Sequence, residues 1–164
     1  MSLIDTQTPI ERMLDLMREV GFVTIENWEN KSRKRIPDGF IRPLKKHYSS
    51  RLIDFLEDAY LTKIEFWKFN RVPSGVWGER KRCVEYLDWL GKKLSYLKQS
   101  DWYQVAAKDF QENFGSSLLA QQKSIADLLS DYLDFNFLPW RFAVAPNGFW
   151  GKKKNHRRFL DFVQ

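Results

Sequence analysis

Two clusters of cations are the side chains with the clearest capacity for chemistry in this 164-residue chain. Each cluster follows a tryptophan, Trp77 or Trp150, and a helix that begins near that tryptophan would carry the cations in its first turn. The helix macrodipole favours acids there by about 0.3–1 kcal/mol each. Cations at that end, beside exposed backbone N–H groups, therefore indicate a phosphate-bearing partner. The clusters are Arg80, Lys81 and Arg82 after Trp77, and Lys152, Lys153, Lys154, Arg157 and Arg158 after Trp150.

A third basic run extends the same hypothesis. The net charge of +6 and the pI near 9.4 are compatible with a polyanionic partner. Runs of lysine and arginine also occur as a solvated face without a ligand, so both interpretations stay open. The third run comprises Lys31, Arg33, Lys34 and Arg35.

The sequence contains no pattern that indicates catalysis or metal binding. Its two histidines, His47 and His156, do not form a helical pair, and one cysteine, Cys83, gives no His/Cys ligand set. It lacks a P-loop, a nucleophile elbow and a dinucleotide-binding glycine motif. We therefore predict that the protein is not an enzyme and has no catalytic residue, metal ligand or cofactor.

The tryptophans belong to a repeated motif. The segment 66–78 returns at 139–151, with Trp, Phe, Pro, Gly and Trp in the same order. The shift that carries Trp67 onto Trp140, called the repeat offset below, also carries the Leu87-Asp88 pair onto Leu160-Asp161. Residues 13–16 match as a partial third copy at the same offset. A repeat of this length without a gap indicates a duplicated structural unit.

Residues kept in both copies are interpreted as architecture. The aromatic rings could stack on bases, but their recurrence favours a structural core. The recurring carboxylates Asp15, Asp88 and Asp161 are predicted to accept hydrogen bonds from backbone or indole N–H groups. The predicted core residues are Trp67, Phe69, Trp77, Trp89, Trp140, Phe142 and Trp150.

Apolar spacing predicts a mainly α fold. Amphipathic helices are expected over residues 10–20, 52–59, 84–97 and 118–132. Each Trp-x-Phe segment is expected to be an extended aromatic linker that leads through a Pro-x-Gly turn into a helix near Trp77 or Trp150. The fold class is therefore two tandem helical repeat units, each of about 73 residues, with short extended Trp/Phe/Pro-Gly linkers. We expect an N-terminal helix over 1–21, repeat units over 22–97 and 98–164, and one compact body.

The motifs resemble a Trp-rich tandem repeat of large algal, protist, viral and some bacterial proteins. The resemblance covers most of residues 10–164 and rests on Asp101-Trp102, Pro139-Trp140-Arg141-Phe142, the segment 146–150 and Leu160-Asp161-Phe162. The first copy departs from the pattern, with Phe66 in place of the proline before Trp67. The resemblance implies a tandem repeat and implies no activity, catalytic residue or ligand.

The leading hypothesis is a non-enzymatic nucleic-acid-binding module. The cations would contact the phosphate backbone of DNA or RNA, and the Trp-rich core would hold the basic helix starts at a fixed separation. Binding of this kind is mostly electrostatic and falls steeply with salt.

The alternative is a protein-interaction or scaffold repeat domain. Residues 101–137 carry six acidic and two basic side chains, whereas residues 138–164 carry one acidic and six basic. The acidic stretch could then pair with basic segments of a neighbouring copy. One continuous basic face favours nucleic acid, whereas cations neutralised by Asp127, Asp131 or Asp134 favour the scaffold.

The sequence also predicts an intracellular, soluble protein without a membrane partner. No apolar run approaches the roughly 18 residues that a membrane-spanning helix needs. The N-terminus lacks the pattern of a signal peptide. The single cysteine is compatible with a reducing compartment.

Overall fold

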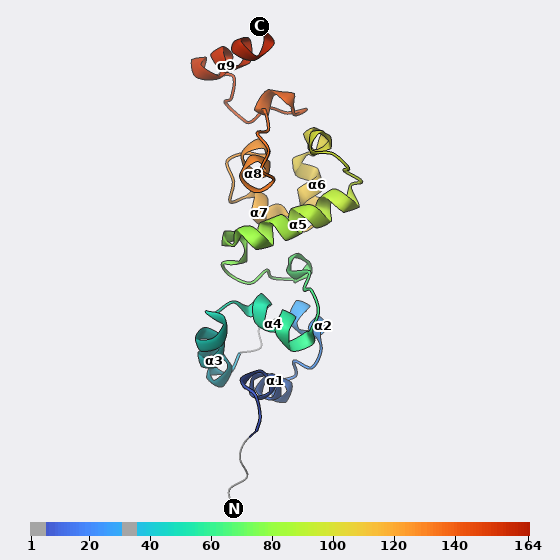
Figure 1. The fold of residues 1–164 in the computed structure, drawn as a ribbon, viewed down its shortest axis with the longest axis vertical. Helices are drawn as coiled ribbons and strands as arrows, with labels where there is room; N and C mark the ends of the chain where they lie inside the picture. The colour runs from blue at the N-terminus through green and yellow to red at the C-terminus, as the bar shows by residue number, and fades with distance from the viewer. Residues whose placement is uncertain (1–5, 31–35) are drawn as a thin grey trace, which may run out of the picture. The chain divides into compact units, whose positions relative to one another are not determined.

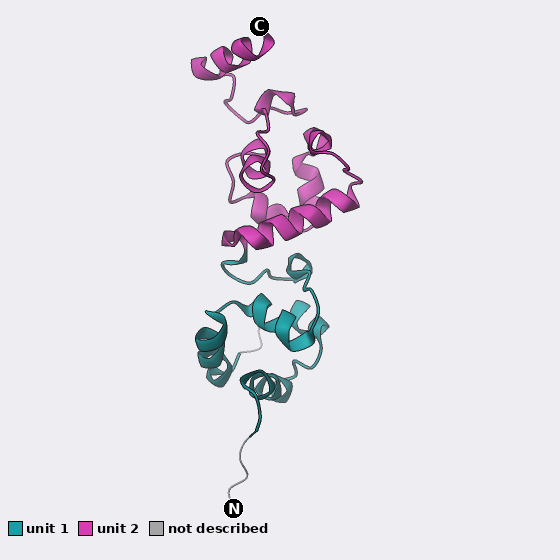
Figure 2. Cartoon of the chain, in the orientation of Figure 1, with its two compact units in different colours: residues 1–76 teal, residues 77–164 magenta. Residues whose placement is uncertain are grey.

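The computed structural model describes residues 6–30 and 36–164 and is mainly helical, as the apolar spacing predicts. Within those residues every regular element is an α-helix or a short 3₁₀ helix, and no strand occurs. The chain divides into two compact units, residues 1–76 (unit 1) and 77–164 (unit 2) (Figures 1 and 2).

Unit 1 is built on its first helix. A capping box starts that helix, because Thr8 and Glu11 exchange hydrogen bonds between side chain and backbone N–H. The helix packs against the third and fourth helices of the unit. The elements are α1 (Pro9–Glu19), α2 (Ile25–Glu29), α3 (Asp38–Tyr48), α4 (Leu52–Tyr60) and the 3₁₀ turn η1 (Phe66–Lys68).

The core of unit 1 combines methionines of α1 with aromatic rings from the other helices. Met13 and Met17 are completely buried. Trp28 and Phe40 lie 5.7 Å apart between ring centroids, and Phe40 meets Phe55 edge-on at 5.2 Å. Edge-to-face pairs at such separations contribute beyond the area that they bury.

The longest helix of the described residues lies near the start of unit 2. Later elements of the same unit bury one of its faces. Cys83, Tyr86, Leu87 and Leu90 on that face are completely buried, and the helix contacts α8. The elements are η2 (Val76–Gly78), α5 (Arg80–Lys93), η3 (Gln99–Gln104), α6 (Ala107–Glu112), α7 (Ser116–Leu119), α8 (Ile125–Tyr132), η4 (Pro139–Arg141) and α9 (Lys153–Val163).

A close approach at Gly115 fixes the α6–α7 turn on α5. The Tyr86 hydroxyl donates to the Asn113 carbonyl at 2.9 Å. A Cβ atom on Gly115 would lie 2.2 Å from that hydroxyl oxygen, so only glycine leaves the space. Nearby, the Trp77 indole N–H donates to Ser117 Oγ at 2.8 Å.

Several elements start one repeat offset apart. This holds for α4 and α8, for η1 and η4, and for α5 and α9. Gly75 and Gly148 both have positive φ, 82° and 70°, as their shared turn position requires. The intervening stretch differs, because α3 is a single 11-residue helix whereas α6 and α7 are separate short helices.

Local boundaries differ from the sequence predictions. The helices after Trp77 and Trp150 begin three residues later, at Arg80 and Lys153, because the tryptophans lie in the turns that precede them. The aromatic linkers contain the 3₁₀ turns η1 and η4 and are not wholly extended. Residues 118–132 form two helices, and α5 ends at Lys93.

The boundary between the compact units falls inside the first sequence copy, between Val76 and Trp77. It falls there because α5 packs with the helices after it. The limits of the sequence repeat at 22–97 and 98–164 stay a prediction.

Candidate functional site

The first basic run is engaged within unit 2. The Arg80 guanidinium, at the start of α5, lies 2.9 Å from the Asp134 carboxylate and donates to the Asp131 carbonyl oxygen. It also lies 5.8 Å from the centroid of the Tyr132 ring. Both charged groups are exposed, so the pair contributes about 0–1 kcal/mol. These contacts join the first turn of α5 to the end of α8.

Arg82 does not present its charge to solvent, contrary to the predicted phosphate contact. Its side chain is 1% exposed, and its Nη1 atom lies 2.8 Å from Glu85 Oε2. Helical spacing explains the burial, because Arg82 lies on the same side of α5 as Tyr86. Removing one partner of such a pair would leave a buried charge. The third member of the run, Lys81, is exposed.

The second basic run has the opposite character. Lys152 is the N-cap residue of α9, and four further cations follow along one side of that helix. All five side chains are exposed, and within residues 6–30 and 36–164 none of them forms an ion pair. Arg158 lies 5.9 Å from the centroid of the Trp140 ring. The run is Lys152, Lys153, Lys154, Arg157 and Arg158.

The third basic run, Lys31, Arg33, Lys34 and Arg35, lies outside the described residues. The structure therefore places two of the three predicted runs, and of these only the second is fully exposed.

The predicted core aromatics divide by burial. Trp67, Phe69, Trp77 and Phe142 are buried, whereas Trp89 and Trp140 are half-buried. Trp150 departs from the prediction, since 45% of its surface is exposed. Its ring meets Phe159 edge-on at 5.5 Å, but it lacks the covering helices that enclose Trp77.

The recurring carboxylates also differ from their predicted role. Asp15 accepts from the Gln7 amide at 2.5 Å and from Arg18 at 2.8 Å. Asp88 accepts from Lys92 Nζ at 2.6 Å, and Asp161 is exposed. For Asp15 and Asp88, side-chain donors take the place of the backbone or indole N–H groups that we expected.

Cys83 and His156 have structural hydrogen bonds. The Cys83 thiol donates to the Trp77 carbonyl at 3.2 Å, and burial raises its pKa, which disfavours the reactive thiolate. His156 Nε2 is hydrogen-bonded to the Trp150 carbonyl. Among the described residues no three His, Cys, Asp or Glu side chains are grouped to hold a metal ion.

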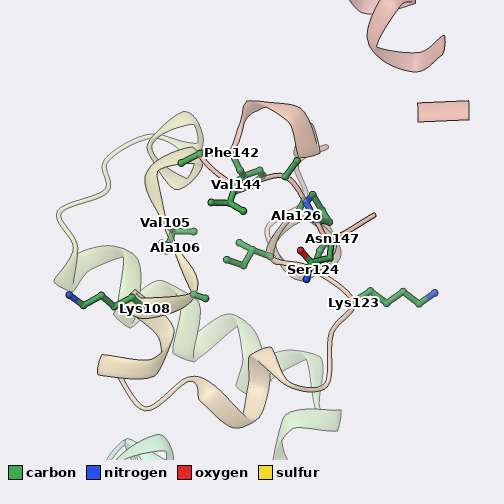
Figure 3. A pocket seen from close by; sticks show the side chains of 14 residues that line it. Val105, Ala106, Lys108, Lys123, Ser124, Ala126, Phe142, Val144 and Asn147 are labelled. Atoms are coloured by element: carbon green, nitrogen blue, oxygen red, sulfur yellow. The ribbon is translucent and has the colours of Figure 1, made fainter. Parts of the chain in front are cut away.

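A cavity of about 410 Å³ lies in unit 2 where the chain enters α6 and α8 (Figure 3). Val105, Ala126, Phe142 and Val144 give it a mainly apolar lining, and Ser124 contributes a polar edge. Lys108 and Lys123 extend away from it on opposite sides (Figure 3). The lining combines small apolar groups and does not bring together an acid, a base and a nucleophile.

Helix α9 exposes an apolar face that we did not predict. Leu160 and Val163, three residues apart on one side of the helix, are 55% and 56% exposed. The repeat offset maps Leu160 onto Leu87 and Val163 onto Leu90, both of which are completely buried in α5. That comparison is the sequence signal that identifies the face.

Searches with this chain against protein-family models, curated proteins and solved structures gave no match. None of the helices in the described part of the chain combines the length and the apolar character needed to cross a bilayer.

Proposed function

We propose that this chain is a non-enzymatic protein-interaction module built from tandem helical repeats, in which cations at helix starts hold acidic segments of the repeat. The carrying observation is the contact of Arg80 with the Asp134 carboxylate and the Asp131 carbonyl. The run that resembles a phosphate site in sequence thus serves a contact between protein segments.

Two shared features support a repeat architecture as the basis of this module. Equivalent elements, the 3₁₀ turns η1 and η4 among them, begin one repeat offset apart, and the turn glycines Gly75 and Gly148 share positive φ. Stacked repeats bury a continuous core between neighbours and present extended surfaces to partners. Such an arrangement supports a scaffold function, which needs no catalytic centre.

A second candidate function is nucleic-acid binding through the second basic run alone. Its support is the exposure of all five cations along one side of α9. The burial of Arg82 and the pairing of Arg80 argue against a matching site on α5.

Fluorescence anisotropy separates the two functions. Labelled single- and double-stranded DNA and RNA are titrated with the protein at low and at moderate salt, alongside a variant with Lys152, Lys153 and Lys154 changed to Gln. The interaction module predicts no binding at moderate salt. Micromolar binding that weakens in the triple variant and falls with salt would overturn the proposal in favour of phosphate contacts.

A further inference from the structure

Three helices in this chain have residues that correspond to one another through the repeat offset. Met13 of α1, Tyr86 of α5 and Phe159 of α9 are successive members of one series, and Met17, Leu90 and Val163 form another. The same face of each helix can therefore be compared directly.

That face is buried in the first two helices. On α1, Met13 and Met17 are completely buried, and the helix packs on α3 and α4. On α5, Tyr86 and Leu90 are completely buried, and the helix contacts α8. In both cases the covering elements come later in the chain than the helix and belong to the same compact unit.

On α9 the Phe159 ring is half-buried against Trp140 and Trp150, whereas the two aliphatic positions beside it are open. Leu160 is 55% exposed where Leu87 is completely buried, and Val163 is 56% exposed where Leu90 is completely buried. Two aliphatic side chains on this face therefore remain in contact with water, although their transfer to an apolar environment would be favourable.

The entry to α9 is nevertheless built like the entry to α5. The Cys83 thiol bonds to the Trp77 carbonyl, and His156 bonds to the Trp150 carbonyl at the equivalent positions. Trp77 meets Tyr86 edge-on at 5.4 Å, and Trp150 meets Phe159 edge-on at 5.5 Å. The open face therefore belongs to a helix with the same local construction.

The segment that covers α5 shows the chemistry that an equivalent cover of α9 would have. Trp102 lies against Gly91, since a Cβ there would be 2.9 Å from the indole ring. Tyr86 donates to the Asn113 carbonyl, and Trp77 donates to Ser117. This cover, residues 98–138, supplies an aromatic ring, a carbonyl and a hydroxyl to the helix face.

The charges of α9 are complementary to those of the segment that covers α5. The cover segment is acidic, with six acidic and two basic side chains in residues 101–137. Helix α9 carries four cations, Lys153, Lys154, Arg157 and Arg158, and the single acid Asp161. The repeat offset carries Arg80, the residue that pairs with Asp134, onto Lys153.

From these observations we propose that the open face of α9, centred on Leu160 and Val163 and edged by Lys153, is a docking surface for the acidic helical segment of another repeat copy, of the kind formed by residues 98–138. This inference rests on the proposed interaction function and names its partner and its surface. The partner is a segment of the same repeat, recognised by an aromatic ring over the face and by carboxylates opposite the cations.

A chain extended in register tests the proposal at high effective concentration. Residues 92–138 are appended after Gln164, since the repeat offset carries Gly91 onto Gln164. Helical content, intrinsic tryptophan fluorescence and limited proteolysis are compared for three proteins. These are the extended chain, the extended chain with Leu160→Asp and Val163→Asp, and the natural chain with the same two changes.

The proposal predicts that the appended segment gains helix and that tryptophan emission shifts to the blue relative to the doubly substituted extended chain. The appended segment should also be cleaved at least about tenfold more slowly than in that variant, because cleavage follows the open population. The two changes are expected to leave the natural chain folded. An appended segment that stays protease-sensitive, or is equally protected with Leu160→Asp and Val163→Asp, would overturn the proposal. Concentration-dependent dimers of the natural chain that vanish on Leu160→Asp would instead assign the face to α9–α9 pairing and also overturn it.

The two proposals fail separately. Salt-sensitive nucleic-acid binding would remove the interaction function whatever the appended segment does. An unfolded appended segment in a protein that binds no nucleic acid would remove only the docking surface on α9.

Discussion

Two tryptophans at the same position of the repeat motif have different surroundings. Trp77 is 5% exposed and donates to Ser117, whereas Trp150 is 45% exposed. The motif shows that each can enter a core. Whether each does depends on the segments packed against it, which the motif alone does not encode.

Truncating these two residues should therefore have unequal effects. Trp77→Ala is expected to reduce the free energy of unfolding by about 3–5 kcal/mol, because it leaves a large cavity. Trp150→Ala should cost about 1–2 kcal/mol, because only part of that ring is buried. Urea denaturation of both variants measures the difference. Equal losses would show that the solution environment of Trp150 is as closed as that of Trp77.

At Arg82 the sequence prediction of an exposed phosphate contact differs from the structure. The run Arg80 to Arg82 suggests three exposed cations, but helical geometry turns Arg82 toward the buried face, where Glu85 accepts from it at 2.8 Å. An acid three residues after the arginine, together with its place beside Tyr86, was the available signal. Lys152, Lys153 and Lys154, by contrast, are all exposed, as the predicted phosphate contact requires.

At the scale of elements, the positions of helices were easier to predict than whether other segments cover their apolar faces. Apolar spacing located α1, α4 and α5 to within a few residues and the end of α8 at Tyr132, because that spacing directly encodes a buried stripe. The separation of α7 from α8 was missed, since Leu118 and Leu119 continue the apolar pattern across the break. The open face of α9 was also missed, because Leu160 and Val163 occupy the same apolar positions as Leu87 and Leu90, and apolar spacing alone does not show which helix is covered.

Matched substitutions on α5 and α9 test this difference. Leu87→Asp should unfold unit 2, since it places a charge at a completely buried position without a partner. Leu160→Asp should change the free energy of unfolding by less than about 0.5 kcal/mol, as is usual for exposed positions. Thermal denaturation followed by circular dichroism provides the readout. A large loss in the Leu160 variant would mean that the α9 face is already covered.

The contact of the α6–α7 turn with α5 depends on a glycine, Gly115, which leaves room for the Tyr86 hydroxyl. Gly115→Ala would place a Cβ 2.2 Å from the Tyr86 hydroxyl and 3.0 Å from the Phe110 ring, both within the core. We expect a loss of about 1–3 kcal/mol from overpacking. Gly78→Ala is the matched control, since no atom lies within 4 Å of the added group. Comparable losses in denaturant melts of the two variants would contradict the close approach.

At the scale of the whole molecule, buried phenols and the buried thiol set the response to alkaline pH. Burial raises the pKa of Tyr86 and of Cys83, and desolvation together with Asp58 raises the pKa of Tyr48 to about 12. The folded chain therefore holds these protons at a pH where the unfolded chain has released them. Their contribution to stability is present below the ordinary values and is lost as pH rises above them.

We accordingly expect the free energy of unfolding to fall as pH rises from 8 to 11, in both units. Tyr86→Phe should be less stable at pH 8 by about 1 kcal/mol, because it loses the bond to Asn113. In the same variant the free energy of unfolding should decline less steeply above pH 10, because the variant lacks the phenol whose pKa burial raises. A decline as steep as that of the natural chain would indicate that Tyr86 is not protected from ionisation.

The difference in cover between α5 and α9 underlies the proposed docking surface, and hydrogen–deuterium exchange of the natural chain probes this difference without any substitution. Amides of the α5 segment 84–93 should exchange at least about a hundredfold more slowly than amides of the α9 segment 157–163, because only α5 has its apolar face covered and opens with the core of unit 2. Equal protection of the two segments would contradict this difference, since it would mean that the face of α9 is already buried.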